Sequence, residues 1–299
     1  MNKIFVLWVF ILLGLQTNSQ ISHYNQYPTF SLHHILDDKL ENISFALSLR
    51  VLVSDYNGPI IRLRRANDNL EEDFFADSSN DIVDLNAIDA WRNGNAVFVV
   101  RWYDQSGLNR DAIQTDLSRQ PPFTSDPIMP YIQGDGRSDR LDVLTSIQLL
   151  TNAGANGTVL SVMSVTRRQQ NSFGVLNQRN RWSVHANWGN GSLYFDPGMC
   201  CNNPRQFNNN DFTNKFAHYT FIRATNSVTV RLNNVQKLSG NYTRSRCTLN
   251  NNFGIFYANG LNSRLHSNMK LSEFIMYSTD IPNTVYEDIE KDSILCWEL

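Results

Sequence analysis

The sequence predicts an all-β protein, a sandwich of two antiparallel sheets with a few short helices. Short runs rich in β-branched and aromatic residues recur along most of the chain. Asn, Gly and Ser separate these runs, and such residues favour turns between strands. Asparagine is frequent and only 18% of the residues are charged, which is typical of a β protein with many loops.

Eight segments have the composition of strands. In chain order they are residues 59–65, 96–103, 157–165, 191–196, 216–223, 227–234, 253–257 and 270–278. Each is a short apolar or alternating run bounded by turn residues, as in a β-sandwich.

Helical signals are confined to three places. Apolar residues recur at helical spacing over residues 45–52, so we expect a helix there. A capping Asp84 and a terminating Gly94 delimit a second helix. The third is expected over residues 282–295, whose apolar residues follow one face.

One domain is expected over residues 20–299. Sandwiches of roughly 200–250 residues are common as single domains. No linker, repeat or low-complexity tract divides the chain, and residues 118–130, with four of the nine prolines, are expected to be a long loop.

The N-terminus predicts secretion. Lys3 precedes an apolar run over residues 4–15, which is shorter than the roughly 20 residues that cross a bilayer. Such a run suits a signal peptide, here residues 1–19 with cleavage before Gln20. No later apolar stretch is long enough to span a membrane, so a secreted protein is expected.

The four cysteines are expected to be paired in an oxidising compartment. Sequence alone allows three pairings of Cys200, Cys201, Cys247 and Cys296. The paired spacing of metal ligands is absent, so neither a metal nor another cofactor is expected. In a eukaryotic host, four sequons predict glycans on Asn42, Asn156, Asn190 and Asn241.

The net charge of −2, with both signs mixed, gives no reason to expect a nucleic-acid partner. Arg62, Arg64 and Arg65 do cluster, but on a strand-like segment with acids close behind. We expect them to pair with those neighbouring carboxylates.

Two long stretches resemble one known family. Residues 47–69 and 84–114 contain an S-Y-S-G-P-like turn and the motif Y-D-Q-S-G-x-x-x-D, which begins at Tyr103. They resemble the N-terminal part of the catalytic domain of the α-L-arabinofuranosidase B family. That family also carries adjacent cysteines after a strand ending near Phe-Asp, as Cys200 and Cys201 do here. The resemblance is good over residues 45–115 and weaker beyond them.

The resemblance implies a concanavalin-like jelly roll with sugar held in a groove on one face. It also implies that Cys200 and Cys201 bond to each other and pack against the sugar, which leaves Cys247 to pair with Cys296. Stiffening a loop is the structural alternative for the adjacent pair.

The motif at residues 103–107 is expected to be structural. Asp104 and Ser106 can hydrogen-bond a turn in which Gly107 supplies backbone freedom. No histidine is placed by the sequence to activate Ser106, so we expect no nucleophile here.

Catalysis by a retaining glycosidase needs two carboxylates about 5–5.5 Å apart. The resemblance places the nucleophile at Thr220 and the acid within residues 257–263, and neither place has a carboxylate. His218 lies on the same strand face as Thr220, but this pair does not replace two carboxylates. Weak catalytic candidates remain at Asp196, Asp211 and Glu273.

Two functions rank above the rest. The first is a secreted protein that binds arabinofuranosyl-type glycans and has lost its catalytic carboxylates. Its expected sugar contacts are Trp188, Tyr194, Thr220, Cys200 and Cys201, whereas Trp182 suits the core. The alternative is an active retaining α-L-arabinofuranosidase with displaced carboxylates, and a purely structural extracellular module ranks third. The expected partner is a polysaccharide or another glycan, and an arabinose-containing one is what the resemblance implies.

Overall fold

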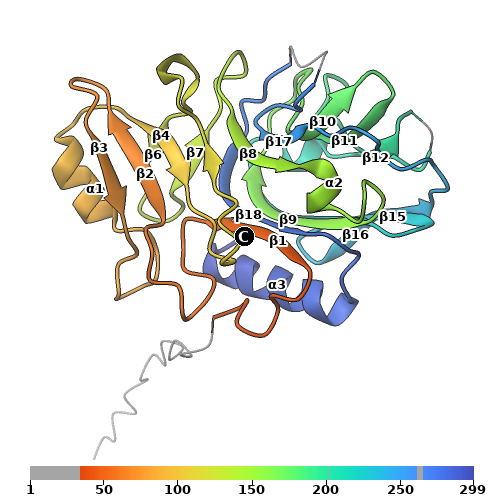
Figure 1. The fold of residues 1–299 in the computed structure, drawn as a ribbon, viewed down its shortest axis with the longest axis horizontal. Helices are drawn as coiled ribbons and strands as arrows, with labels where there is room; N and C mark the ends of the chain where they lie inside the picture. The colour runs from red at the N-terminus through yellow and green to blue at the C-terminus, as the bar shows by residue number, and fades with distance from the viewer. Residues whose placement is uncertain (1–33, 202, 261–264) are drawn as a thin grey trace, which may run out of the picture. The chain divides into compact units, whose positions relative to one another are not determined.

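Two antiparallel sheets contain most of the regular structure (Figure 1). The computed structural model describes residues 34–201, 203–260 and 265–299, so the expected signal peptide lies outside the described residues. The eight-stranded sheet has the order β16-β15-β14-β9-β18-β7-β6, and β1 also pairs with β18. The ten-stranded sheet has the order β13-β12-β11-β10-β17-β8-β5-β4-β2-β3.

The strands of the eight-stranded sheet are β1 (Ile43–Ser48), β6 (Phe123–Thr124), β7 (Tyr131–Gln133), β9 (Gly157–Ser164), β14 (Phe216–Arg223), β15 (Ser227–Leu232), β16 (Val235–Asn241) and β18 (Lys270–Tyr277). Those of the ten-stranded sheet are β2 (Ile61–Arg65), β3 (Glu71–Phe74), β4 (Val97–Trp102), β5 (Ala112–Ile113), β8 (Leu141–Ser146), β10 (Phe173–Asn177), β11 (Asn180–His185), β12 (Ser192–Met199), β13 (Gln206–Asn208) and β17 (Asn252–Ile255). The α-helices are α1 (Leu85–Arg92), α2 (Ile147–Leu150) and α3 (Asn283–Cys296), and the 3₁₀ helices are η1 (Leu117–Arg119) and η2 (Asn210–Phe212).

Aromatic side chains join the two sheets. Phe173 of β10 meets Phe274 of β18 edge-on, with ring centroids 4.9 Å apart. Phe195 of β12 and Phe221 of β14 pack in the same manner at 5.4 Å. Such ring pairs stabilise the fold beyond the contribution from burying the rings themselves. The predicted two-sheet β-sandwich with a few short helices is confirmed.

All eight predicted strands are present, but the helix expected over residues 45–52 is wrong. That segment contains β1, and all six of its residues are buried. Phe45 and Leu47 enter the core between the sheets, whereas Ala46 joins a smaller cluster that includes Ile289 of α3. A strand buried on both faces can carry apolar residues on either face, so some of them fall at helical spacing by coincidence.

The second and third helices are confirmed as α1 and α3. The Asp84 carboxylate accepts a hydrogen bond from the backbone N–H of Ala87, at 2.9 Å, which caps α1. Residues 118–130 are less irregular than expected, because they include part of η1 and all of β6.

The turn after β4 is structural, as predicted. Asp104 Oδ1 accepts hydrogen bonds from the backbone N–H groups of Ala46 and Ser106, at 2.8 and 2.9 Å. Its Oδ2 accepts from the Ser106 hydroxyl and from the backbone N–H of Arg110. Gly107 has φ +83°, a conformation that side chains disfavour. Asp104 therefore fixes this loop against β1.

The predicted Cys247–Cys296 disulfide is wrong, whereas Cys200 and Cys201 are bonded to each other. Cys247 lies in a loop whose backbone pairs with Gly154, and burial raises its thiol pKa to about 11. Cys296 is the last residue of α3, and its thiol interacts electrostatically with the Arg50 cation. The two thiols therefore have different polar neighbours, although both contact the main core cluster.

None of the helices in the described part of the chain is long and apolar enough to span a membrane.

Candidate functional site

A pocket of about 370 Å³ lies on the face of β10, β11 and β12 that points away from the sandwich core. Its apolar lining consists of Leu176, Trp188, Tyr194 and Leu265. Its polar lining consists of Asn171, Arg181, His185 and Arg205.

Strand alternation creates this face. On β11, Trp182 and Val184 point into the core, so Arg181 and His185 point outward. The antiparallel register pairs His185 with Tyr194 of β12, and Ser183 with Asp196. The outward-facing side chains of β11 therefore lie next to the outward-facing side chains of β12.

Asp196 does not line the pocket but contacts three residues that do, Arg181, His185 and Arg205. Its carboxylate is fully buried and accepts two hydrogen bonds from Arg205, one of them from Nε to Oδ1 at 2.7 Å. Arg181 Nη1 and His185 Nε2 lie 3.7 and 3.8 Å from Asp196 Oδ2. Bidentate pairing of this kind is strong and fixes the geometry of both groups.

His185 is neutral near pH 7. Burial, with a smaller contribution from Arg181, lowers its pKa to about 4 despite the opposing effect of Asp196. Its Nδ1 lies 3.1 Å from the carbonyl oxygen of Gln170, which fits a proton on that nitrogen. The cluster therefore contains two arginine cations and one carboxylate.

The aromatic rings of the pocket are held by these polar groups. Arg205 lies over the ring of Tyr194, 4.5 Å from its centroid, and the edge-on rings of Trp188 and His185 are 5.3 Å apart. Asn171 is 1% exposed, and its Oδ1 has no hydrogen-bond partner. A flat aromatic wall and an unpartnered hydrogen-bond acceptor thus belong to the same pocket.

Of the predicted sugar contacts, the structure brings together Trp188 and Tyr194. Trp182 is a core residue, as expected, and packs edge-on against Phe195 at 5.4 Å. The Cys200–Cys201 disulfide lies just beyond the end of β12, where the backbone N–H of Cys200 donates to the Arg179 carbonyl. Neither cysteine lines the pocket.

Thr220, another predicted sugar contact, does not line the pocket. It is fully buried on β14 of the other sheet, and its hydroxyl has no hydrogen-bond partner. His218, on the same face, is also buried with both ring nitrogens unpartnered. Asp211 is exposed in η2. None of the three lines the pocket.

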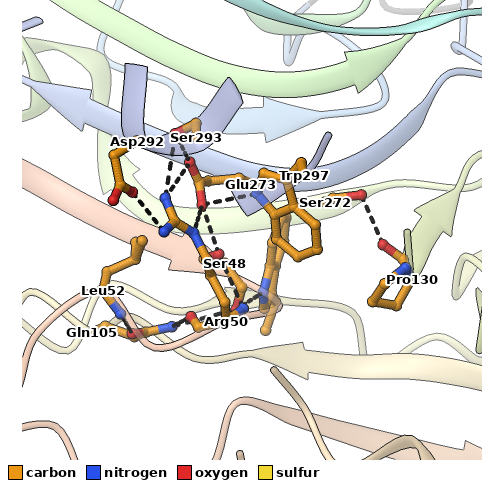
Figure 2. A network of polar contacts seen from close by, with 11 residues as sticks. Ser48, Arg50, Leu52, Gln105, Pro130, Ser272, Glu273, Asp292, Ser293 and Trp297 are labelled. Carbon is orange, nitrogen blue, oxygen red and sulfur yellow. Dashed lines mark hydrogen bonds and ion pairs between the residues drawn. The ribbon is translucent and has the colours of Figure 1, made fainter. Parts of the chain in front are cut away.

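Glu273 belongs to a buried network beneath α3, not to the pocket (Figure 2). Arg50 Nε donates to Glu273 Oε2 at 2.8 Å, and the hydroxyl of Ser293 donates to Oε1 at 2.6 Å. Ser48 and Trp297 also donate to Oε2. Burial alone would raise the pKa of Glu273, but Arg50 and Ser293 hold it below its usual range. Its carboxylate is thus fully occupied by structural contacts.

The sequons differ in exposure. Asn42, Asn190 and Asn241 are exposed, whereas Asn156 is half-buried and donates to Asp280 at 2.9 Å. Asn190 lies beside the pocket, where its amide donates to the Tyr194 hydroxyl at 2.8 Å. Glycosylation at all four stays a prediction.

Sequence reasoning missed the polar half of the pocket. Arg181 and His185 alternate with core residues in residues 180–185, so a strand assignment there would have placed both on one face. Arg205 carries no such signal, because the β12–β13 connection alone brings it to Asp196.

A second cavity of similar size lies between β3 and α1. Glu72, Phe75 and Trp91 are among its lining residues. Its other carboxylates already serve the fold: Asp73 pairs with Arg62 and Tyr103, and Asp84 caps α1. Across the described ranges, no three His, Cys, Asp or Glu side chains form a group that could hold a metal ion.

Solved structures of arabinofuranosidases share this fold. One is an arabinofuranosidase complexed with arabinofuranosyl-α-1,2-xylobiose, with 12% identity, a TM-score of 0.64, and 84% of this chain and 62% of that chain covered. Another is a GH54 α-L-arabinofuranosidase soaked with a cyclic sulfate inhibitor, with 12% identity, a TM-score of 0.65 and the same coverage. A glutamate-to-glutamine mutant of a GH54 enzyme, soaked with 4-nitrophenyl α-L-arabinofuranoside, gives 12% identity, a TM-score of 0.67, and 88% and 64% coverage.

These comparisons define the fold as a β-sandwich that solved arabinofuranosidases share. The resemblance seen in residues 45–115 is confirmed at the level of fold. The chain spans less than two thirds of the length of those enzymes. No protein-family model and no curated protein matches the sequence.

Proposed function

We propose that this is a secreted carbohydrate-binding protein that holds arabinofuranosyl-type glycans in the pocket of Trp188 and Tyr194 without hydrolysing them. Concave pockets with aromatic walls and a few fixed polar groups are typical ligand sites. The arabinofuranosidases of the same fold are the source of the proposed sugar class. Secretion is supported by the N-terminal segment and by the disulfide, which persists in oxidising compartments.

One observation favours binding of the glycan over its hydrolysis. Among the described residues that line the pocket, none has a carboxylate. The nearby Asp196 lies behind that lining, where Arg205 donates to both of its oxygens. Glycoside hydrolysis of the retaining type uses two carboxylates about 5–5.5 Å apart. A pocket whose described lining has no carboxylate favours binding over hydrolysis.

Calorimetric titration with arabinofuranosyl-α-1,2-xylobiose tests this proposal. We expect saturable binding that Trp188→Ala weakens about tenfold or more, because the substitution removes an aromatic wall. Phe75→Ala is the matched control, since Phe75 is a half-exposed ring of the second cavity. Loss of binding in Phe75→Ala with normal binding in Trp188→Ala would move the site to that cavity.

Turnover of an aryl α-L-arabinofuranoside separates binding from catalysis. We expect none above background. Robust turnover that disappears in a folded Asp196→Asn variant would establish the active-enzyme alternative.

A further inference from the structure

The pocket has an excess of positive charge that its own residues do not balance. Arg205 is paired through two nitrogens with Asp196. Within the described part of the chain, the carboxylate that pairs with Arg181 is that same Asp196, whose Oδ2 lies 3.7 Å from Arg181 Nη1. His185 adds no compensating negative charge.

The position of Arg181 makes this imbalance costly. Its side chain is 15% exposed, and its Nε is buried without a hydrogen-bond partner. Burial lowers its pKa, and the neighbouring Arg205 lowers it further against the opposing charge of Asp196. A cation that is partly desolvated and incompletely paired gains most from an incoming anion.

We propose that the pocket selects glycans bearing an anionic group, a carboxylate or a sulfate ester, which pairs with Arg181. The inference rests on the proposed function, because it names the sugar class of the same pocket. Arginine suits both groups because its planar guanidinium donates two parallel hydrogen bonds to two oxygens.

The remaining lining fits a sugar that carries such a group. The ring of Trp188 offers a flat apolar surface to a pyranose or furanose face. The unpartnered Asn171 Oδ1 can accept a hydrogen bond from a sugar hydroxyl. With about 370 Å³, the pocket has room for a sugar unit together with its charged substituent.

Affinity electrophoresis with paired polysaccharides tests the inference. The probes are polygalacturonate and its carboxyl-reduced form, a sulfated galactan and its desulfated form, and neutral linear arabinan. We expect wild-type protein to bind one or both acidic polymers about tenfold or more tightly than the neutral counterpart. A preference within the polygalacturonate pair identifies the anion as a carboxylate, and a preference within the galactan pair identifies it as a sulfate ester.

The variants are Arg181→Gln, Arg181→Lys and Arg137→Gln. Arg181→Gln should remove the preference for acid, and Arg181→Lys should retain part of it because the charge remains. Arg137 is an exposed arginine outside the pocket lining, so Arg137→Gln controls for general charge attraction. Thermal melts establish that each variant is folded.

The outcomes separate the two proposals. Equal binding of acidic and neutral forms, with arabinan retained, overturns the anionic ligand and leaves sugar binding intact. An acid preference that survives in Arg181→Gln, or that Arg137→Gln removes equally, also overturns it. Failure to bind any of the polymers would count against the proposed function itself.

Discussion

His218 is a buried titratable side chain with no hydrogen-bond partner for either ring nitrogen. Burial, with smaller contributions from Arg50 and Arg231, lowers its pKa to about 4 despite the opposing effect of Glu273. The fold therefore tolerates this histidine only in its neutral form.

Acid should weaken the fold through His218. In the unfolded chain its pKa is near 6.5, so below that pH the unfolded state takes up a proton that the folded state refuses. Stability is lost progressively from about pH 6.5 to about pH 4, by up to about 3 kcal/mol for this histidine. Urea unfolding of wild type and His218→Leu over this range measures the effect, and the variant should have the flatter profile.

Thr220→Val is the matched control for that measurement. Thr220 lies on the same face of β14 and is equally buried, but it has no ionisable group. Its pH profile should follow that of the wild type. An unchanged slope in His218→Leu would place the acid sensitivity elsewhere, and His185, with the same lowered pKa, would be examined next.

Between elements, the contact of Glu273 on β18 with Arg50 fixes how α3 lies on its sheet. Arg50 also pairs with Asp292 of α3, through Nη1 and Oδ2 at 2.6 Å. The network thus joins the segment after β1, strand β18 and the last helix (Figure 2).

Removing Glu273 should be costly. Glu273→Leu leaves the buried Arg50 with the half-exposed Asp292 as its carboxylate partner, and breaking one side of a buried pair costs about 3–5 kcal/mol. Asp211→Asn, at an exposed position, should change stability by less than about 0.5 kcal/mol. Denaturant unfolding of both variants decides the matter, and equal stabilities would show that the network is unimportant.

The strands could be read from sequence where alternation or an apolar run was strong, as in β14, whose predicted limits match. Strands β10 and β11 were missed because Asn, Gly and Arg interrupt their apolar pattern, and pairing with neighbours stabilises them instead. The candidate site was half predicted. Local composition pointed to Trp188 and Tyr194, but the pairing of Arg181 and Arg205 with Asp196 depends on a register that sequence does not display.

At the scale of the whole molecule, the structure predicts the number of free thiols per chain. Cys247 and Cys296 are free thiols, while Cys200 and Cys201 are bonded. Thiol titration of the denatured, unreduced protein should therefore find two reactive groups per chain, and Cys247→Ser should leave one. Native protein should react slowly at Cys247, because that thiol is buried and protonated at neutral pH. A count of zero would mean that these two cysteines are oxidised in the mature protein.

The order of strands in both sheets sets when the protein can fold. Strand β17 joins β10 to β8, and β18 lies between β9 and the strands β1 and β7 (Figure 1). Each therefore closes its sheet from the middle, although both come late in the chain, at residues 252–255 and 270–277. A ribosome delivers the N-terminal residues first, so neither sheet can close until these last strands emerge. Both sheets therefore remain incomplete through most of the chain's synthesis.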